Sequence, residues 1–189
     1  MKGLLRWLPL LMALLMVPAC GGNKKAAEKA LAAAEAAYAV ISEQANNLAP
    51  DQAKDIEAEL AAAREDLAKG DAKSVLAAAQ DVQSKVKTLA EALPGLQTKL
   101  EADWKVLADV VPGALAALDK KLEDFGQPPA GMPGRDKFDS AAIKLEQLNT
   151  QWGEARSLGG SGKLAQAIAL GEQVKYEAVK ALTEFQVGS

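Results

Sequence analysis

The sequence predicts an all-α protein made of antiparallel helical hairpins, with about six to seven helices. Alanine, leucine, lysine, glutamate and glutamine dominate the composition, and these residues are strong helix formers. Apolar residues recur at spacings of three and four along most of the chain, which is the period of an amphipathic helix. Aromatic residues make up only 4% of the chain, so we expect a thin core in which helices approach closely at alanines.

The first two helices are expected before residue 70. One covers residues 26–47, and Pro50 with Asp51 opens the second, because proline suits the first turn and an acid suits the positive end of the helix dipole. Gly70 with Asp71 has the form of a helix stop followed by a new cap.

Two proline–glycine pairs interrupt the middle of the chain. The third helix is expected to end at Pro94–Gly95, and it has the most regular stripe in the sequence, formed by Val75, Ala79, Val82, Val86, Leu89 and Leu93. A fourth stripe runs from Leu100 to Val111 and is continued from Leu115 to Phe125. An interior proline removes a hydrogen bond and collides with the preceding turn, so Pro112–Gly113 indicates either a kink or a restart, and we expect a restart.

A linker is predicted at residues 126–135, which hold three prolines and three glycines. It separates a helical region at 26–125 from a helical hairpin region at 136–189. The hairpin is expected to consist of helices at about 137–157 and 163–186, joined by the flexible turn Gly159–Gly162.

A weak internal repeat relates residues 92 positions apart. It pairs Ile56 with Leu148, Leu60 with Trp152, Ala63 with Ala155, Gly70 with Gly162 and Val82 with Val174. Two alanine-rich hairpins could also share this much by chance. The pattern of a glycine turn and alanines at helical spacing resembles the tetratricopeptide class of hairpins, although the 34-residue period of that class is missing. The resemblance implies close helix contacts within each hairpin.

Residues 1–19 have the architecture of an export signal. Lys2 and Arg6 provide a short positive region, and Leu8–Val17 is an uncharged apolar run of ten residues. A membrane-spanning helix needs about 20 apolar residues, so we expect a signal peptide instead of a permanent span.

The end of this segment, Val17-Pro18-Ala19-Cys20, resembles the bacterial lipobox, with Pro18 as its less usual member. The resemblance implies cleavage between Ala19 and Cys20 and a thioether from the Cys20 thiol to diacylglycerol, in which two or three acyl chains anchor the protein stably. Cys20 is the only cysteine, so it has no disulfide partner within the chain. Residues 20–25 would form the lipidated tether. By the same resemblance, Gly21 favours the periplasmic face of the outer membrane in a host with two membranes.

The composition argues against several functions. Without Lys2 and Arg6, 20 basic residues face 25 acidic ones, so the mature net charge would be −5 and nucleic acid is not expected as a partner. Histidine is absent, which removes the usual catalytic dyads and zinc ligands. Gly159–Lys163 lacks the first glycine and the final Ser or Thr of a phosphate loop. We therefore expect no enzyme activity, cofactor or metal.

Trp104 and Trp152 are the possible interaction anchors. Both fall on apolar stripes and could be core residues, whereas a partly exposed tryptophan is a frequent binding hot spot. The leading hypothesis is a lipid-anchored envelope protein that binds another envelope protein through its helices. The alternatives are a carrier of an apolar ligand and a spacer between membrane and cell wall. Prolines at 94 and 112 argue against a continuous rod, and the end Gln186–Ser189 lacks the final lysine of the major lipoprotein family.

Overall fold

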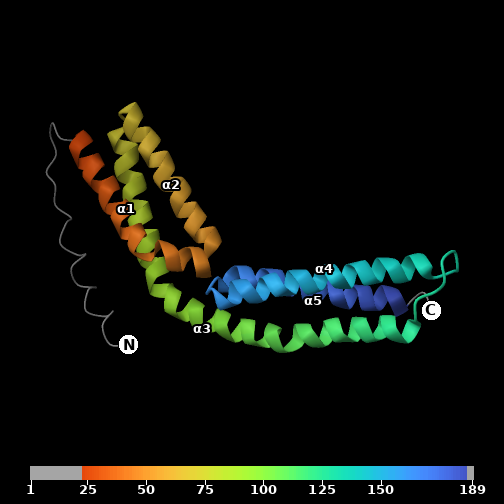
Figure 1. Ribbon diagram of the computed structural model, residues 1–189. Helices are drawn as coiled ribbons and strands as arrows, with labels where there is room; N and C mark the ends of the chain where they lie inside the picture. Colours follow the sequence, from red (N-terminus) through yellow and green to blue (C-terminus); the bar gives the residue numbers. More distant parts are fainter. Residues whose placement is uncertain (1–22, 187–189) are drawn as a thin grey trace.

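The computed structural model describes residues 23–186, with side chains through residue 184, and this part of the chain contains five α-helices and no strand (Figure 1). The all-α class is confirmed, but the number of helices is lower than expected. The helices are α1 (Asn23–Leu48), α2 (Pro50–Lys69), α3 (Ala72–Phe125), α4 (Arg135–Gly160) and α5 (Leu164–Gln186).

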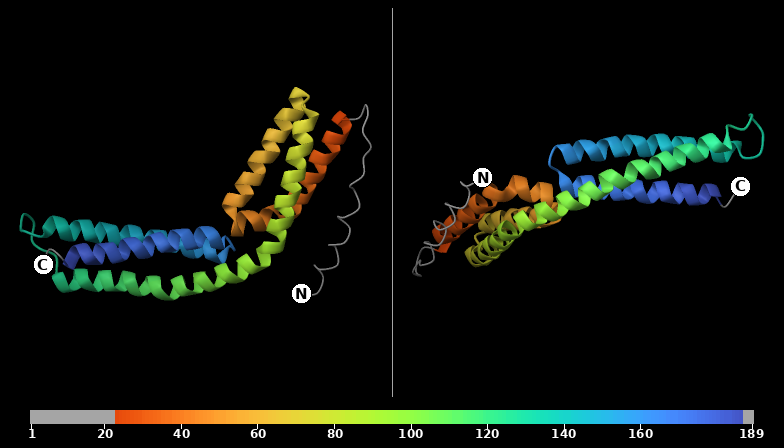
Figure 2. Two further views of the ribbon diagram at one scale, coloured as in Figure 1. Left: turned by 180° about the vertical axis from the view of Figure 1, so that it is seen from behind. Right: turned by 90° about the horizontal axis from the view of Figure 1, so that it is seen from below.

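The helices form two three-helix bundles that share α3. The first bundle consists of α1, α2 and residues 72–93 of α3, and the second consists of residues 104–125 of α3 with α4 and α5. Figures 1 and 2 show the bundles as two arms set at an angle, with α3 bending from one arm into the other. Each arm has its own apolar core, and Trp104 lies at the border of both.

The expected helix ends at Pro94–Gly95 and at Pro112–Gly113 are wrong, because α3 continues through both pairs. The physical reason is that the apolar stripe stays in register from Val75 to Leu122, so one face of a single helix serves both cores. The two prolines are exposed and lie 18 residues, or five helical turns, apart. Their rings therefore point to the same outer side of α3 and leave the cores undisturbed.

The bend of α3 lies in the yellow-green part of the helix between the two arms (Figure 1). Pro94–Gly95 directly follow Leu93, the last buried residue that α3 contributes to the first core. Interior proline is a common cause of helix bending, because the lost hydrogen bond loosens the backbone there. The Thr98 hydroxyl donates a hydrogen bond to the Pro94 carbonyl at 3.1 Å. One of the two pairs that were expected to end a helix thus lies between the two cores, whereas Pro112–Gly113 lies along the second.

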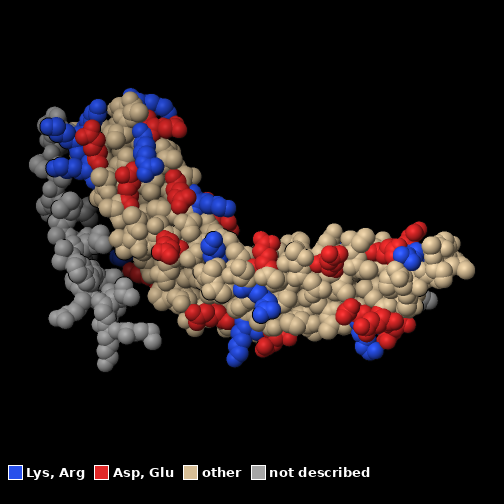
Figure 3. Space-filling view, viewed as in Figure 1, with Lys and Arg blue, Asp and Glu red and all other residues tan. Residues whose placement is uncertain are grey.

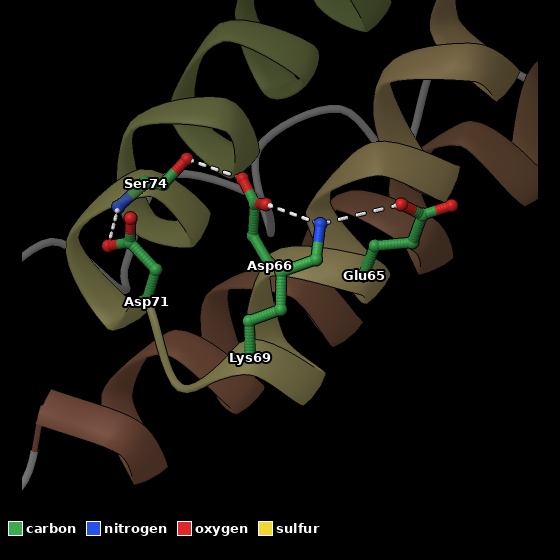
Figure 4. A network of polar contacts seen from close by, with 5 residues as sticks. All are labelled: Glu65, Asp66, Lys69, Asp71 and Ser74. Carbon is green, nitrogen blue, oxygen red and sulfur yellow. Dashed lines mark hydrogen bonds and ion pairs between the residues drawn. The ribbon is translucent and has the colours of Figure 1, made fainter.

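The turn between α2 and α3 has the predicted stop and cap (Figure 4). Gly70 adopts φ +84°, a left-handed conformation that ends α2. The Asp71 side chain then caps α3 by accepting a hydrogen bond from the Ser74 backbone N–H at 3.0 Å. The Ser74 hydroxyl donates to Asp66 Oδ2 at 2.6 Å, and Lys69 lies 3.9 Å from the same carboxylate. These contacts join the end of α2 to the start of α3.

The two hairpins that follow the 92-residue offset have the same register. Helix α3 begins at Ala72 and α5 begins at Leu164, and the turns before them contain Gly70 at φ +84° and Gly162 at φ +80°. The paired positions Ile56 and Leu148, Leu60 and Trp152, Ala63 and Ala155, and Val82 and Val174 are all buried. The α2–α3 and α4–α5 hairpins therefore present the same helical faces to their cores.

Residues 126–134 connect α3 to α4 without helical structure. The corresponding connection in the first bundle, between α1 and α2, is the single residue Ala49. Among residues 23–186, none of the helices combines the length and apolarity needed to cross a membrane.

Candidate functional site

The structure places two of the predicted site residues side by side. The rings of Trp104 from α3 and Trp152 from α4 have centroids 5.5 Å apart and planes inclined by 34°, a separation typical of aromatic pairs. Trp152 is buried and Trp104 is half-buried. The predicted cleavage and lipidation residues, Ala19 and Cys20, lie outside the described residues.

One glycine makes room for this pair, and a second lies in ordinary contact with it. A Cβ at Gly159 of α4 would lie 2.7 Å from Cε2 of Trp104, closer than side chains approach in proteins. A Cβ at Gly171 of α5 would lie 3.4 Å from both Leu107 and Trp152. The missing side chain at Gly159 therefore lets α4 approach the Trp104 indole, whereas the distance at Gly171 would be an ordinary van der Waals contact for a side chain.

A groove of about 620 Å³ opens beside Trp104, and we call it the junction groove. It lies between the end of α1, the middle of α3 and the α4–α5 turn. Its apolar lining includes Leu48, Leu164 and Val40, and Val40 is 82% exposed. Glu43 and Glu101 add two carboxylates. A tryptophan edge, an exposed valine and acidic groups therefore occur together on one surface.

A second groove of about 890 Å³ runs between α3 and α4 at the far end of the second bundle, and we call it the distal groove. Leu122, Phe138, Ala142 and Leu145 provide apolar lining. The remaining lining residues are Asp119, Glu123, Gly126, Gln127, Glu146, Asn149 and Thr150.

The corresponding seam of the first bundle, between α1 and α2, is closed by polar contacts. The Tyr38 hydroxyl donates a hydrogen bond to Glu57 at 2.8 Å, and Arg64 Nε donates to Glu35 at 2.6 Å. Burial and the neighbouring Glu57 carboxylate raise the pKa of Tyr38 to about 12, because both disfavour a phenolate there. Among the described residues that line the distal groove, no side-chain hydrogen bond or ion pair joins α3 to α4.

Ion pairs also cross the other helix seams. Hydrogen bonds to Asp81 and then to Glu59 raise the pKa of Lys85 above its usual range. The contact with Glu59 joins α3 to α2. Lys144 lies 2.8 Å from Glu177 and lowers the pKa of that carboxyl, which ties α4 to α5. Both contacts are partly exposed, so solvent screens them and they contribute modestly to stability. These ion pairs connect neighbouring helices and do not by themselves indicate a catalytic site.

Both grooves combine apolar side chains with carboxylates. Within residues 23–186, no cluster of His, Cys, Asp or Glu has the arrangement of a metal site. The sequence analysis singled out Trp104 and missed both grooves. The distal groove was difficult to find because it depends on how far α3 and α4 stand apart, although the glutamates and aspartates beside apolar positions were visible. Comparisons with protein-family models, curated proteins and solved structures find no match to this chain.

Proposed function

We propose that this protein is a lipid-anchored bacterial envelope protein that binds another envelope protein through its second bundle. The anchor is Cys20, held to the periplasmic face of the outer membrane where the host has two membranes. Helix α1 begins at Asn23, three residues after Cys20, so the first bundle would stand close to the membrane. The second bundle would reach away from it.

The observation that supports this proposal most directly is the distribution of exposed apolar side chains. Among the described residues, seven of the eight large hydrophobic side chains that are exposed lie at or beyond Val106, and the eighth, Val40, lines the junction groove. On the face seen in Figure 3, uncharged surface also extends along the second arm between separate charged groups. Contiguous exposed apolar surface marks interaction sites, and the enrichment of such side chains in the second bundle supports a contact surface there.

The anchor and the interaction need separate tests. Growth of the native host with labelled palmitate should label the wild-type chain, whereas the variant Cys20→Ser should stay unlabelled and leave the membrane fraction. Label on the variant, or an unlabelled wild-type chain, would contradict the anchor.

Crosslinking in intact cells tests the interaction. Photoreactive residues at Val106 and Ile143, both exposed on the second bundle, should yield a defined adduct. The control position is Lys54, which is exposed on α2 of the first bundle and should give none. Adducts at Lys54 alone, or at no position, would contradict an interaction through the second bundle.

A spacer between membrane and cell wall is the second candidate, and α3 now supports it. Its 54 residues form one helix that measures about 80 Å along its axis, so the prolines do not end the helix, which was the expectation that argued against a continuous rod. The angle between the arms argues against a straight rod (Figure 2). Small-angle scattering from the full chain separates the two candidates, since a spacer requires an extended rod and the interaction module a bent particle.

A further inference from the structure

We infer that the distal groove binds a basic amphipathic helix of a partner protein, which would pack between α3 and α4 as a fourth helix of the second bundle. This inference rests on the proposed function and names the chemistry of the partner.

The apolar part of the groove has the properties of a helix-binding surface. Leu122 and Leu145 are buried at its base, and Phe138 and Ala142 are partly buried beside them. The lining residues of α4 extend from Phe138 to Thr150, which corresponds to about 18 Å of helix, or three turns. An amphipathic helix that inserts apolar residues at spacings of three and four matches this length.

The rim of the groove is acidic. Asp119 and Glu123 lie one turn apart on α3, Glu146 faces them from α4, and no lysine or arginine lines the groove. None of these three carboxylates forms an ion pair with another described residue. Two like charges at i and i+4 repel each other on a helix surface. Lysines or arginines on both sides of an inserted apolar stripe would relieve that repulsion and supply the missing partners.

The first bundle shows what a closed seam of this fold looks like. There, Tyr38 with Glu57 and Glu35 with Arg64 connect the first two helices directly. In the second bundle, α4 packs more extensively on α5 than on α3, and its ion pair Lys144–Glu177 also points to α5. The α3–α4 seam is therefore open in its distal part, beyond the contacts of Trp104 with Trp152 and Gly159. A second copy of this acidic chain is a poorer occupant, because its net charge has the same sign as the rim.

The test uses a helical peptide of about 14 residues with leucines at spacings of three and four and lysines on both flanks of the stripe. The peptide is titrated into the full chain in neutral detergent and binding is followed by fluorescence anisotropy of a label on the peptide. The same peptide with glutamates in place of the lysines is the comparison. We expect the lysine peptide to bind at least about tenfold more tightly, because only it complements the rim.

Two protein variants of equal charge locate the binding. The groove variant is Asp119→Lys, Glu123→Lys, Glu146→Lys, and the control is Glu91→Lys, Asp109→Lys, Glu154→Lys, which changes three exposed carboxylates outside both grooves. The groove variant should weaken binding about tenfold or more, whereas the control should retain it within about twofold. Circular dichroism checks that both variants are folded.

Several outcomes would overturn the inference. Equal loss in both variants would mean general attraction to an acidic chain, and equal binding of both peptides would mean that the rim does not select for charge. A dimer of the wild-type chain that dissociates only in the groove variant would assign the groove to a second copy. Photocrosslinks from Val106 or Ile143 that persist in the groove variant would leave the proposed function intact. They would show that the partner does not bind in the distal groove.

Discussion

Gly159 of α4 lies against the indole of Trp104 of α3, with 2.7 Å between the position of a Cβ at residue 159 and Cε2 of the ring. This close approach holds the end of the second bundle against the helix that both bundles share. It also makes glycine necessary at this helical position, although alanine is the better helix former.

Gly159→Ala should therefore destabilise the protein by about 1–3 kcal/mol, because the added methyl group collides with a ring that is itself packed. Gly153→Ala on the same helix is the control. Nothing lies within 4 Å of a Cβ at that position, so higher helix propensity should stabilise the protein by about 0.5–1 kcal/mol. Urea unfolding measures both, and two changes of the same sign would contradict the close packing at Trp104.

The tryptophan pair should show energetic coupling. Trp152→Ala removes a buried ring and should cost about 3–5 kcal/mol, and Trp104→Ala should cost less because Trp104 is half-buried. In a double-mutant cycle the two changes should be coupled by about 0.5–1.5 kcal/mol. Additive costs would indicate that the rings do not interact in solution.

Pro112→Ala distinguishes a continuous α3 from a restarted helix. In a continuous helix the exposed Pro112 occupies an interior position, so alanine should restore a hydrogen bond and stabilise the protein by about 1–3 kcal/mol. Pro50→Ala is the comparison, since Pro50 lies in the first turn of α2, where proline is well tolerated and its loss should change stability little. A destabilising Pro112→Ala would instead favour a helix start at that residue.

Tyr38 should lose its proton at a higher pH than an ordinary tyrosine. Its pKa is raised to about 12 from the ordinary value near 10, so the stability that it contributes is complete below pH 10 and is lost as the pH rises from 10 through 12. Phenolate absorbance of the Tyr176→Phe variant follows Tyr38 alone, because the chain has two tyrosines. Adding Glu57→Gln should lower the midpoint, since it removes the neighbouring negative charge. An unchanged midpoint would show that the contact with Glu57 is absent in solution.

Helix periodicity predicted most of this fold because most of its helices have simple local signals. Gly70 with Asp71 and Pro50 with Asp51 were interpreted correctly since caps and first turns depend on a few neighbouring residues. The prolines of α3 were misinterpreted because the tendency of proline to end a helix was considered without the apolar stripe that continues on both sides of it. Leu96, Leu100 and Trp104 continue the spacing between the two cores, and this continuity was the signal for one long helix.

The grooves could not be predicted in the same way. The sequence placed Trp104 and Trp152 on apolar faces, but their contact depends on how α4 crosses α3. The distal groove depends on a seam that fails to close, and an amphipathic pattern does not encode the distance between two helices. The acidic residues at 119, 123 and 146 look like ordinary solvated charge until the two helices are placed side by side.

The sharing of α3 has a consequence for how the molecule loses its structure. Since one unbroken helix contributes a face to each core, melting of either core exposes apolar residues of α3 and leaves that helix poorly supported at the bend. The two arms are therefore expected to unfold in a single cooperative transition instead of two, although each has a core of its own. A cut in the middle of α3 would leave each core with its own part of that helix, residues 72–93 or 104–125, and would remove this coupling.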